Sequence, residues 1–208
     1  MHTLTLAASK GGVGKTTLAS ALAVEAAGKQ LVGLYDLDPQ QSLARWHELR
    51  DDHDQIRMIE ARSAEEALAE AREKGCQLLV IDTPPALMLA IQPAIEVADL
   101  VVIPCKPSPI DVESIDPTVE LAQTAGTPFV FAINMMSTQG GVGLTEGARK
   151  FLRFSGDVLP QAVSQRLSYT AAMATGQSGP EVEKDGKCAK EITPLWRSIA
   201  RKLAGLGK

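Results

Sequence analysis

Nine residues near the N-terminus combine glycine, lysine and threonine in an order that suits phosphate chemistry: residues 9–17 read Ser-Lys-Gly-Gly-Val-Gly-Lys-Thr-Thr. Closely spaced glycines let a backbone turn tightly and aim its N–H groups at phosphate oxygens. Lys15 can reach the β- and γ-phosphates of a nucleotide, and the Thr16 hydroxyl can bind Mg²⁺. We therefore predict a nucleotide-binding loop. The residues assigned to it are Lys10, Gly11, Gly12, Val13, Gly14, Lys15, Thr16 and Thr17.

Lys10 adds a second cation to this loop, although one lysine is enough to hold the phosphates of one nucleotide. The surroundings suit a phosphate-binding loop, because an apolar run at Leu4–Ala8 precedes it and a helical pattern follows it. Residues 139–145, Gln-Gly-Gly-Val-Gly-Leu-Thr, are similar but carry Leu144 where a lysine is needed. We interpret that second stretch as a flexible loop that does not bind phosphate.

Carboxylates follow two apolar runs at positions where a nucleotide hydrolase needs them. Asp36 and Asp38 come after the run at 31–35, and Asp82 comes after the run at 78–81. A carboxylate at the C-terminal end of a buried strand opens onto the crevice where α/β sheets bind ligands. We predict that Asp82 holds Mg²⁺ through a water, and that Asp36 or Asp38 assists the ion or orients the attacking water. Each alone could be a turn residue, but their order after the loop favours the site.

The elements that must position these residues alternate along the chain. Apolar runs without polar alternation are typical of strands buried on both faces, and here they occur at Leu4–Ala8, Leu31–Tyr35, Leu78–Ile81, Leu100–Ile103 and Phe129–Ile133. Helical spacing occurs at Thr16–Gly28, Pro39–Asp51, Ser63–Gly75 and Val112–Ala125. This order predicts an α/β fold, a mostly parallel twisted sheet flanked by helices on both faces. We expect one domain over residues 1–208, with no helix-turn-helix domain before the loop.

Charge and cysteine usage narrow the function classes. Residues 1–150 carry 12 Lys/Arg against 20 Asp/Glu, whereas residues 151–208 carry 9 against 5, so the basic C-terminal quarter hints at a polyanionic partner. Cys76, Cys105 and Cys188 are far apart and odd in number, which indicates neither a disulfide framework nor a thiolate metal site. No apolar run approaches the ~20 residues that cross a bilayer, and no signal-peptide pattern opens the chain. We therefore expect a cytoplasmic protein.

Three motifs in order resemble one family over almost the whole chain: the loop that starts at Lys10, the Asp-Leu-Asp-Pro-Gln segment that starts at Asp36, and the strand that runs into Asp82-Thr-Pro-Pro. Together they are similar to the deviant Walker A ATPases of the ParA/MinD family. The segment Asp38–Trp46 resembles the ParA branch, and within it the short ParF-like partition ATPases. The resemblance implies a P-loop NTPase fold, ATP and Mg²⁺ as cofactors, and weak intrinsic ATP hydrolysis.

The resemblance also assigns a role to Lys10. In this family the lysine crosses the interface of an ATP-sandwich dimer to the phosphates of the other subunit, which implies a nucleotide-dependent homodimer. Charge agrees, because a second buried cation is tolerable only where an anion faces it. By the same resemblance Asp38 positions the lytic water, Asp36 supports Mg²⁺ and the switch, and Asn134 reads the adenine base.

Partners outside the dimer follow from the same resemblance. The ATP-bound dimer would bind nucleoid DNA without sequence preference, and a centromere- or cargo-binding adaptor protein would stimulate hydrolysis and release it. This implies a role in plasmid or chromosome partition. Arg166 resembles a basic position in the DNA-facing region of the family, and the further DNA-binding candidates are Arg153, Lys184, Lys187 and Lys190.

Three alternatives stay open beside partition. A MinD-like membrane cycle would use the last segment, which places Leu195, Trp196, Ile199 and Leu203 on one face and basic residues opposite. That face equally suits packing on the sheet, which we favour, so we expect no stable membrane association. A metal-cluster reductase partner is disfavoured by the cysteine contexts. The same ATPase cycle could also position a protein cargo, such as a chemoreceptor cluster or a microcompartment.

Overall fold

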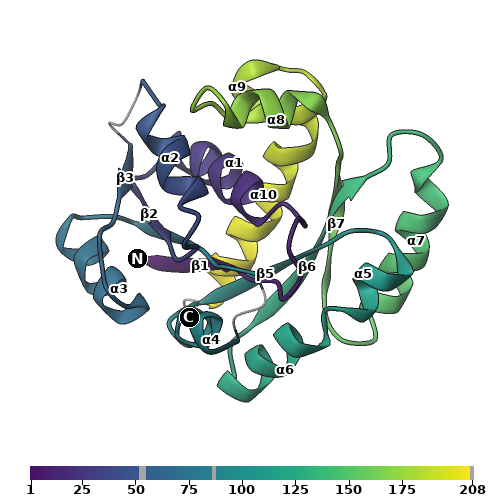
Figure 1. The fold of residues 1–208 in the computed structure, drawn as a ribbon, viewed down its shortest axis with the longest axis horizontal. Helices are drawn as coiled ribbons and strands as arrows, with labels where there is room; N and C mark the ends of the chain where they lie inside the picture. The colour runs from purple at the N-terminus through teal and green to yellow at the C-terminus, as the bar shows by residue number, and fades with distance from the viewer. Residues whose placement is uncertain (52–54, 86–87, 207–208) are drawn as a thin grey trace.

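The computed structural model describes residues 1–51, 55–85 and 88–206, which form a parallel sheet covered by helices on both faces (Figure 1). Over these residues the sheet has seven strands in the order β3-β2-β4-β1-β5-β6-β7, and every neighbouring pair is parallel. The predicted parallel α/β sheet is confirmed. The strands are β1 (His2–Leu6), β2 (Val32–Asp36), β3 (Ile56–Met58), β4 (Leu78–Asp82), β5 (Leu100–Cys105), β6 (Phe129–Met136) and β7 (Val158–Ser164).

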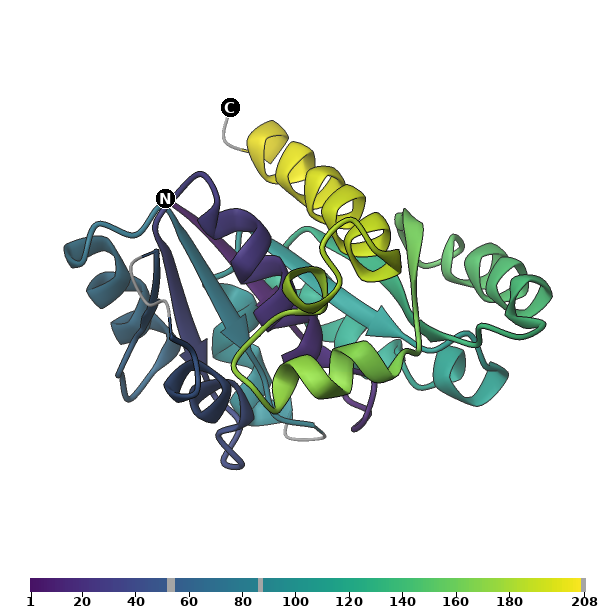
Figure 2. The same cartoon turned by 90° about the horizontal axis from the view of Figure 1, so that it is seen from above.

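The helices divide between the two faces of the sheet. The helices are α1 (Lys15–Ala27), α2 (Ser42–Glu48), α3 (Ala64–Glu73), α4 (Met88–Glu96), α5 (Pro109–Glu113), α6 (Asp116–Ala125), α7 (Gly141–Leu152), α8 (Leu167–Met173), α9 (Gly179–Val182) and α10 (Lys187–Leu206). Helices α1, α2, α8 and α10 contribute to one apolar core, and α3 to α7 contribute to the cores on the other face. The two views in Figures 1 and 2 show this layering.

Alternate strand residues enter the two cores, which explains the continuous apolar runs. Leu4 and Leu6 of β1 pack in the core with α1 and α10, whereas Val101 and Ile103 of β5 point to the opposite core with α4 to α7. All four side chains are fully buried. Since successive strand residues face opposite sides, a strand covered on both faces needs apolar residues at every position.

The strand order brings the candidate site together at one edge of the sheet. β1 lies between β4 and β5 at the centre, and the loop that follows it leads into α1. β2 and β4 pair so that Asp36 and Asp82 are register partners at their last residues. The loop after β1 and the carboxylates that end β2 and β4 therefore converge at the C-terminal edge, as the sequence order predicts.

Several elements differ from the sequence expectations. β3, β7 and α4 were not predicted; β3 has only three residues, too few for a recognisable apolar run. The helix expected over 112–125 is two helices, because α5 ends at Glu113 and α6 begins at Asp116 with Pro117 in its first turn. Proline cannot donate its N–H inside a helix but is well tolerated at a helix start, so it marks the break.

The prediction of a flexible loop at residues 139–145 is wrong, because α7 begins at Gly141. Gly140, just before it, has a left-handed conformation (φ 68°). Thr145, Ala148 and Leu152 form a buried helical face that extends beyond the stretch compared with the phosphate loop.

The polar segment 176–187, expected to be a loop, contains the short helix α9. Ser178 begins α9 with a capping box to Glu181, which satisfies backbone N–H groups at the start of that helix.

The C-terminal helix packs on the sheet, as favoured from the sequence. Leu195, Ile199 and Leu203 of α10 are at most 3% exposed, and Trp196 is half-buried against the same core. The apolar face considered for membrane binding is therefore used inside the protein. Among the residues described, no helix is both long enough and apolar enough to cross a bilayer.

Candidate nucleotide-binding site

The glycine-rich loop joins β1 to α1 and has the backbone shape that its glycines allow. Gly12 and Gly14 have φ angles of 69° and 85°, in the left-handed region that favours glycine. A Cβ at Gly14 would lie 2.4 Å from the amide nitrogen of Asn134, so a side chain there would also clash. The loop ends at Lys15, the first residue of α1, which places a helix N-terminus beside it. This arrangement supplies backbone N–H groups and a favourable dipole to an anion.

Lys15 lies inside the loop that it serves. Its ammonium Nζ donates to the carbonyl oxygen of Ala8 at 3.3 Å, and the residue is 7% exposed. Burial lowers the pKa of Lys15, while the carboxylates of Asp82 and Asp38 act to raise it. A buried cation that is held by a neutral carbonyl is suited to an anionic ligand, because ion pairing would offset its desolvation.

Thr16 and Asp82, which the sequence assigns to magnesium binding, are in direct contact, and their metal role stays a prediction. The Thr16 hydroxyl donates to Asp82 Oδ2 at 2.6 Å, and Asp82 is 1% exposed. The other carboxylate oxygen, Oδ1, is buried without a hydrogen-bond partner. Burial raises the pKa of Asp82 to about 7. An unpartnered buried oxygen beside a hydroxyl fits a hard cation with oxygen ligands.

Asp36 and Asp38 shape the segment after β2. Asp36 Oδ1 accepts the N–H of Asp38 at 3.0 Å, and its Oδ2 accepts the N–H groups of Leu43 at 2.9 Å and Ala44 at 3.0 Å. Asp36 thus holds the first turn of α2, and its metal role stays a prediction. Asp38 is half-buried, and its Oδ1 accepts the N–H of Gln40 at 2.9 Å. Over the described residues, no cluster of three or more His, Cys, Asp or Glu side chains could hold a metal without other ligands.

Asn134 supports the loop from β6. Its amide nitrogen donates to the carbonyl oxygen of Val13 at 2.7 Å, and the residue is buried. The next residue, Met135, has a left-handed φ of 55°, which is unusual away from glycine. A cavity of about 100 Å³ lies beside these residues and is lined also by Thr17, Gln165 and Arg166. The adenine contact expected of Asn134 stays a prediction, whereas its contact with the loop is direct.

Ser9 and Lys10 attach the loop to the α5–α6 region. The Ser9 hydroxyl donates to the carbonyl oxygen of Ser114 at 2.7 Å, and the Lys10 ammonium lies 2.7 Å from Asp111 Oδ1. Asp111 also accepts a hydrogen bond from Ser108, the N-cap residue of α5. Although burial raises the pKa of Asp111, Lys10 and Ser108 hold it below its ordinary value. Within one chain, Lys10 therefore pairs with a carboxylate.

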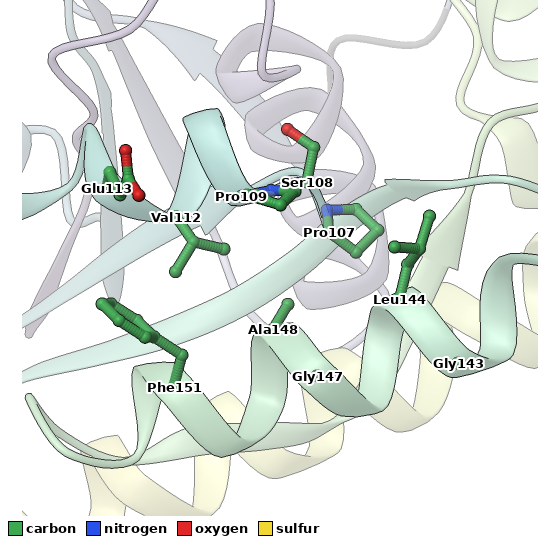
Figure 3. A pocket seen from close by; sticks show the side chains of 10 residues that line it. All are labelled: Pro107, Ser108, Pro109, Val112, Glu113, Gly143, Leu144, Gly147, Ala148 and Phe151. Atoms are coloured by element: carbon green, nitrogen blue, oxygen red, sulfur yellow. The ribbon is translucent and has the colours of Figure 1, made fainter.

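An apolar groove of about 250 Å³ lies on the other side of α5, between α5 and α7 (Figure 3). Val112 and Pro107 face Leu144 and Phe151 across it. Val112 of α5 lines this groove, whereas its chain neighbour Asp111 pairs with Lys10.

The predicted DNA-binding residues do not share one environment. Arg166 is bound to Glu191 of α10, with Nη2 2.5 Å from Oε1, and Glu191 also accepts from Tyr169 and Ser164. The hydrogen bonds that Arg166 donates to Glu191 raise the pKa of Arg166, whose side chain is only 18% exposed. The other candidates, which are Arg153 after α7 and Lys184, Lys187 and Lys190 near the start of α10, are exposed.

Sequence reasoning missed contacts that join distant segments. Arg50, just after α2, makes two hydrogen bonds to the Glu181 carboxylate at 2.6 and 3.0 Å, and a third at 3.0 Å to the Gly176 carbonyl. The Trp46 indole N–H donates to the Gln177 carbonyl at 2.8 Å. Among the residues involved in the site and these contacts, the Ser108-x-x-Asp111 and Ser178-x-x-Glu181 segments do carry a local sequence signal, that of a helix start.

Comparisons with known proteins agree with this geometry. Residues 4–179 match the model of a family described as the CobQ/CobB/MinD/ParA nucleotide binding domain. A protein of Gloeobacter kilaueensis named "Maintenance of carboxysome distribution protein A" is 32% identical over 93% of this chain and 90% of its own. The protein of the same name from Halothiobacillus neapolitanus is 27% identical over 95% of both chains. "Protein ParA" of Rhizobium radiobacter is 29% identical over 53% of this chain and 51% of its own.

Solved structures share the fold. Apo McdA of Cyanothece has a TM-score of 0.78 at 19% identity, with 98% of this chain and 99% of that chain covered. A putative plasmid partition protein from Borrelia burgdorferi bound to AMPPNP has a TM-score of 0.77 at 19% identity, covering 97% and 99%. The cell division protein MinD of Aquifex aeolicus has a TM-score of 0.80 at 16% identity, covering 97% and 98%.

Proposed function

The chain belongs to the CobQ/CobB/MinD/ParA family of nucleotide-binding domains, and from this premise we propose that it is an ATP hydrolase that pairs in its ATP-bound form and positions a cargo. The observation that carries the proposal is the contact between Thr16 and Asp82, which leaves one buried Asp82 oxygen unpartnered beside the phosphate loop. These groups fit a magnesium–triphosphate.

In this proposal the chain's own residues hold and orient the nucleotide. The N–H groups of the glycine-rich loop and the Lys15 ammonium bind phosphate oxygens, and Thr16 and Asp82 hold the metal. Mg²⁺ would supply charge neutralisation on the phosphate oxygens. Asp38 lies at the same edge of the sheet, where it orients the attacking water. Asn134 keeps the loop in its binding conformation through its bond to Val13.

In this proposal, Lys10 of each subunit completes the nucleotide site of the other subunit. In a single chain it is held by Asp111. We infer that it exchanges this carboxylate for the phosphates of a second subunit when both chains hold ATP. An exchange of one anion for another keeps the ammonium paired throughout, so it avoids the large cost of an unpaired, partly buried charge.

We propose further that the cargo is a protein assembly. Two relatives that align over most of their length are named for carboxysome distribution, which favours a protein assembly as the cargo. Plasmid or chromosome partition, our first expectation, is the second candidate, supported by the relative named ParA. In both cases the ATP-bound dimer uses nucleoid DNA as its support, and an adaptor protein links it to the cargo and stimulates hydrolysis.

The test is to separate pairing from turnover. Asp38→Ala should retain ATP-dependent dimers, measured by light scattering, and should lose phosphate release. Lys10→Ala should bind ATP as a monomer and fail to pair. Brisk hydrolysis by Asp38→Ala, or full pairing by Lys10→Ala, would contradict the roles given to these residues.

A further inference from the structure

The cavity of about 100 Å³ beside Asn134 extends the phosphate loop toward the ends of β6 and β7. Its lining includes Thr17 of α1, Asn134 and Met135 near the end of β6, and residues of β7 and α8. Thr17 follows Lys15 by two residues, so the cavity adjoins the part of the loop that suits phosphate. A nucleotide whose phosphates lie in the loop can therefore place its nucleoside part here. We call this feature the β6–β7 cavity.

One carboxylate, that of Glu191 on α10, binds three residues of the cavity wall. Its Oε1 accepts hydrogen bonds from the Ser164 hydroxyl at 2.7 Å and from the Arg166 guanidinium at 2.5 and 3.1 Å. Its Oε2 accepts from the Tyr169 hydroxyl at 3.0 Å and from the Ser164 N–H at 3.2 Å. Ser164, Arg166 and Tyr169 all line the β6–β7 cavity. Glu191 therefore ties the end of β7 and the start of α8 to the C-terminal helix.

The contacts of Glu191 are largely closed to water. The side chains of Glu191 and Arg166 are only 13% and 18% exposed, and Ser164 and Tyr169 are buried. Burial, and then the negative charge of Glu191, raise the pKa of Tyr169, so its hydroxyl stays protonated and donates. Since a hydrogen bond lost in such a place leaves a polar group without a partner, the network holds its members in one arrangement.

The charge of Glu191 is needed to hold the wall, because Arg166 is its ion-pair partner. Arg166 is also the N-cap residue of α8, in an extended conformation, so the ion pair fixes the point where the chain leaves β7 and enters that helix. The next turn of α8 brings Tyr169 back to the same carboxylate. A wall that is held in this way is preorganised for a ligand, which lowers the cost of binding.

We propose that Glu191 is a positioning residue of the nucleotide site, which fixes the wall of the β6–β7 cavity for the nucleoside part of ATP. The inference rests on the proposed function, which places the triphosphate in the loop. Without the carboxylate, the Arg166 guanidinium loses this ion pair and the Tyr169 hydroxyl loses this acceptor, so the wall is no longer held. Binding of the phosphates uses the N–H groups of the loop and Lys15, and it should not depend on Glu191.

The experiment compares two ligands by calorimetric titration of the full-length protein with Mg²⁺: ATP, and inorganic tripolyphosphate, which has no nucleoside part. The variant Glu191→Gln keeps the shape of the side chain and removes its charge. We expect its ratio of ATP affinity to tripolyphosphate affinity to fall by about tenfold, since hydrogen bonds to a charged group are the strong ones. In hydrolysis assays KM for ATP should rise with little change in kcat. Glu183→Gln is the matched control, because Glu183 binds α8 at the Ser168 hydroxyl, and it should keep the wild-type ratio.

Tyr169→Phe is a second variant, which removes one donor and keeps the ring. Its ratio should fall by about threefold, and it decides the matter alone should Glu191→Gln not fold. An unchanged ratio in the variants would overturn the inference and leave the proposed function standing. So would equal losses for both ligands, because Glu191 would then act on the fold as a whole, or equal affinities of the wild type for both ligands. Wild-type protein that binds neither ligand would instead remove the nucleotide site, and with it the proposed function.

Discussion

The ammonium nitrogen of Lys10 lies 2.7 Å from Oδ1 of Asp111, so the second lysine of the phosphate loop is paired within its own chain. Asp111 is 8% exposed and is fixed by Ser108 at the start of α5. The nucleotide-dependent pairing that we propose for two subunits would therefore compete with this contact.

Asp111→Asn should strengthen ATP-dependent dimerisation. The Lys10 side chain is 35% exposed, and ion pairs open to solvent contribute at most about 1 kcal/mol. Each of the two subunits releases one Lys10, so the dimer dissociation constant should fall by up to about thirtyfold, as measured by sedimentation with a non-hydrolysable analogue. Glu113→Gln, on the same helix, is the control and should change nothing. Weaker pairing in Asp111→Asn would show that Asp111 supports the dimer instead.

Lys15→Ala should abolish ATP binding and leave the fold intact. Lys15 is buried, and the one hydrogen-bond acceptor that it reaches in the described part of the chain is the Ala8 carbonyl. Its removal therefore deletes a desolvated charge whose pKa is already lowered by burial. The midpoint of thermal unfolding should stay the same or rise. Calorimetric titration with Mg-ATP checks the first part, with Lys29→Ala as a lysine control away from the loop. Residual binding within tenfold of wild type would refute the assignment.

Asp82 should make the stability of the nucleotide-free protein depend on pH. Its folded pKa of about 7 exceeds the ordinary value of about 3.9, so between these pH values the folded state binds more protons than the unfolded chain. The free energy of unfolding should then fall as the pH rises from about 4 to about 7, by at most about 1.4 kcal/mol per unit from this group. Urea titrations should show a flatter profile for Asp82→Asn but not for Asp51→Asn. Superimposable profiles of wild type and Asp82→Asn would be the contrary finding.

Arg50→Ala should destabilise the protein by about 2 kcal/mol. The Arg50 side chain is 9% exposed, binds Glu181 through two hydrogen bonds, and lies 5.4 Å from the centre of the Trp46 ring. Its loss would also leave the Gly176 carbonyl without this donor. A double-mutant cycle with Glu181→Gln in urea should give a coupling energy above about 1 kcal/mol. Additive effects would mean that the pair adds no stability.

Local motifs made much of the site predictable. Lys15, Thr16 and Asp82 were assigned because a phosphate loop and a carboxylate at a strand end each have a short sequence signature. The parallel order of the strands then brought Thr16 within 2.6 Å of Asp82. The sheet was predictable for a similar reason, since strands buried on both faces form continuous apolar runs.

Contacts between distant segments were not predictable from one sequence. Glu191 neutralises Arg166 from another element, and Asp111 pairs with Lys10 across about a hundred residues. Neither ion pair produces a recognisable sequence motif, because a salt bridge between distant segments depends on how those segments pack in the fold and not on their spacing along the chain. The prediction of a loop at 139–145 was wrong because it rested on glycines that resemble those of the phosphate loop. The residues that bury one face of α7, Ala148 and Leu152, lie farther along the chain.

The central claim is that two ATP-bound chains pair through Lys10. Sedimentation equilibrium with Mg²⁺ and a non-hydrolysable analogue should give a species of twice the 22.1 kDa chain mass for wild type, and only single chains for Lys10→Ala at equal nucleotide occupancy. Single chains for wild type at tens of micromolar, or equal pairing by both proteins, would contradict the account.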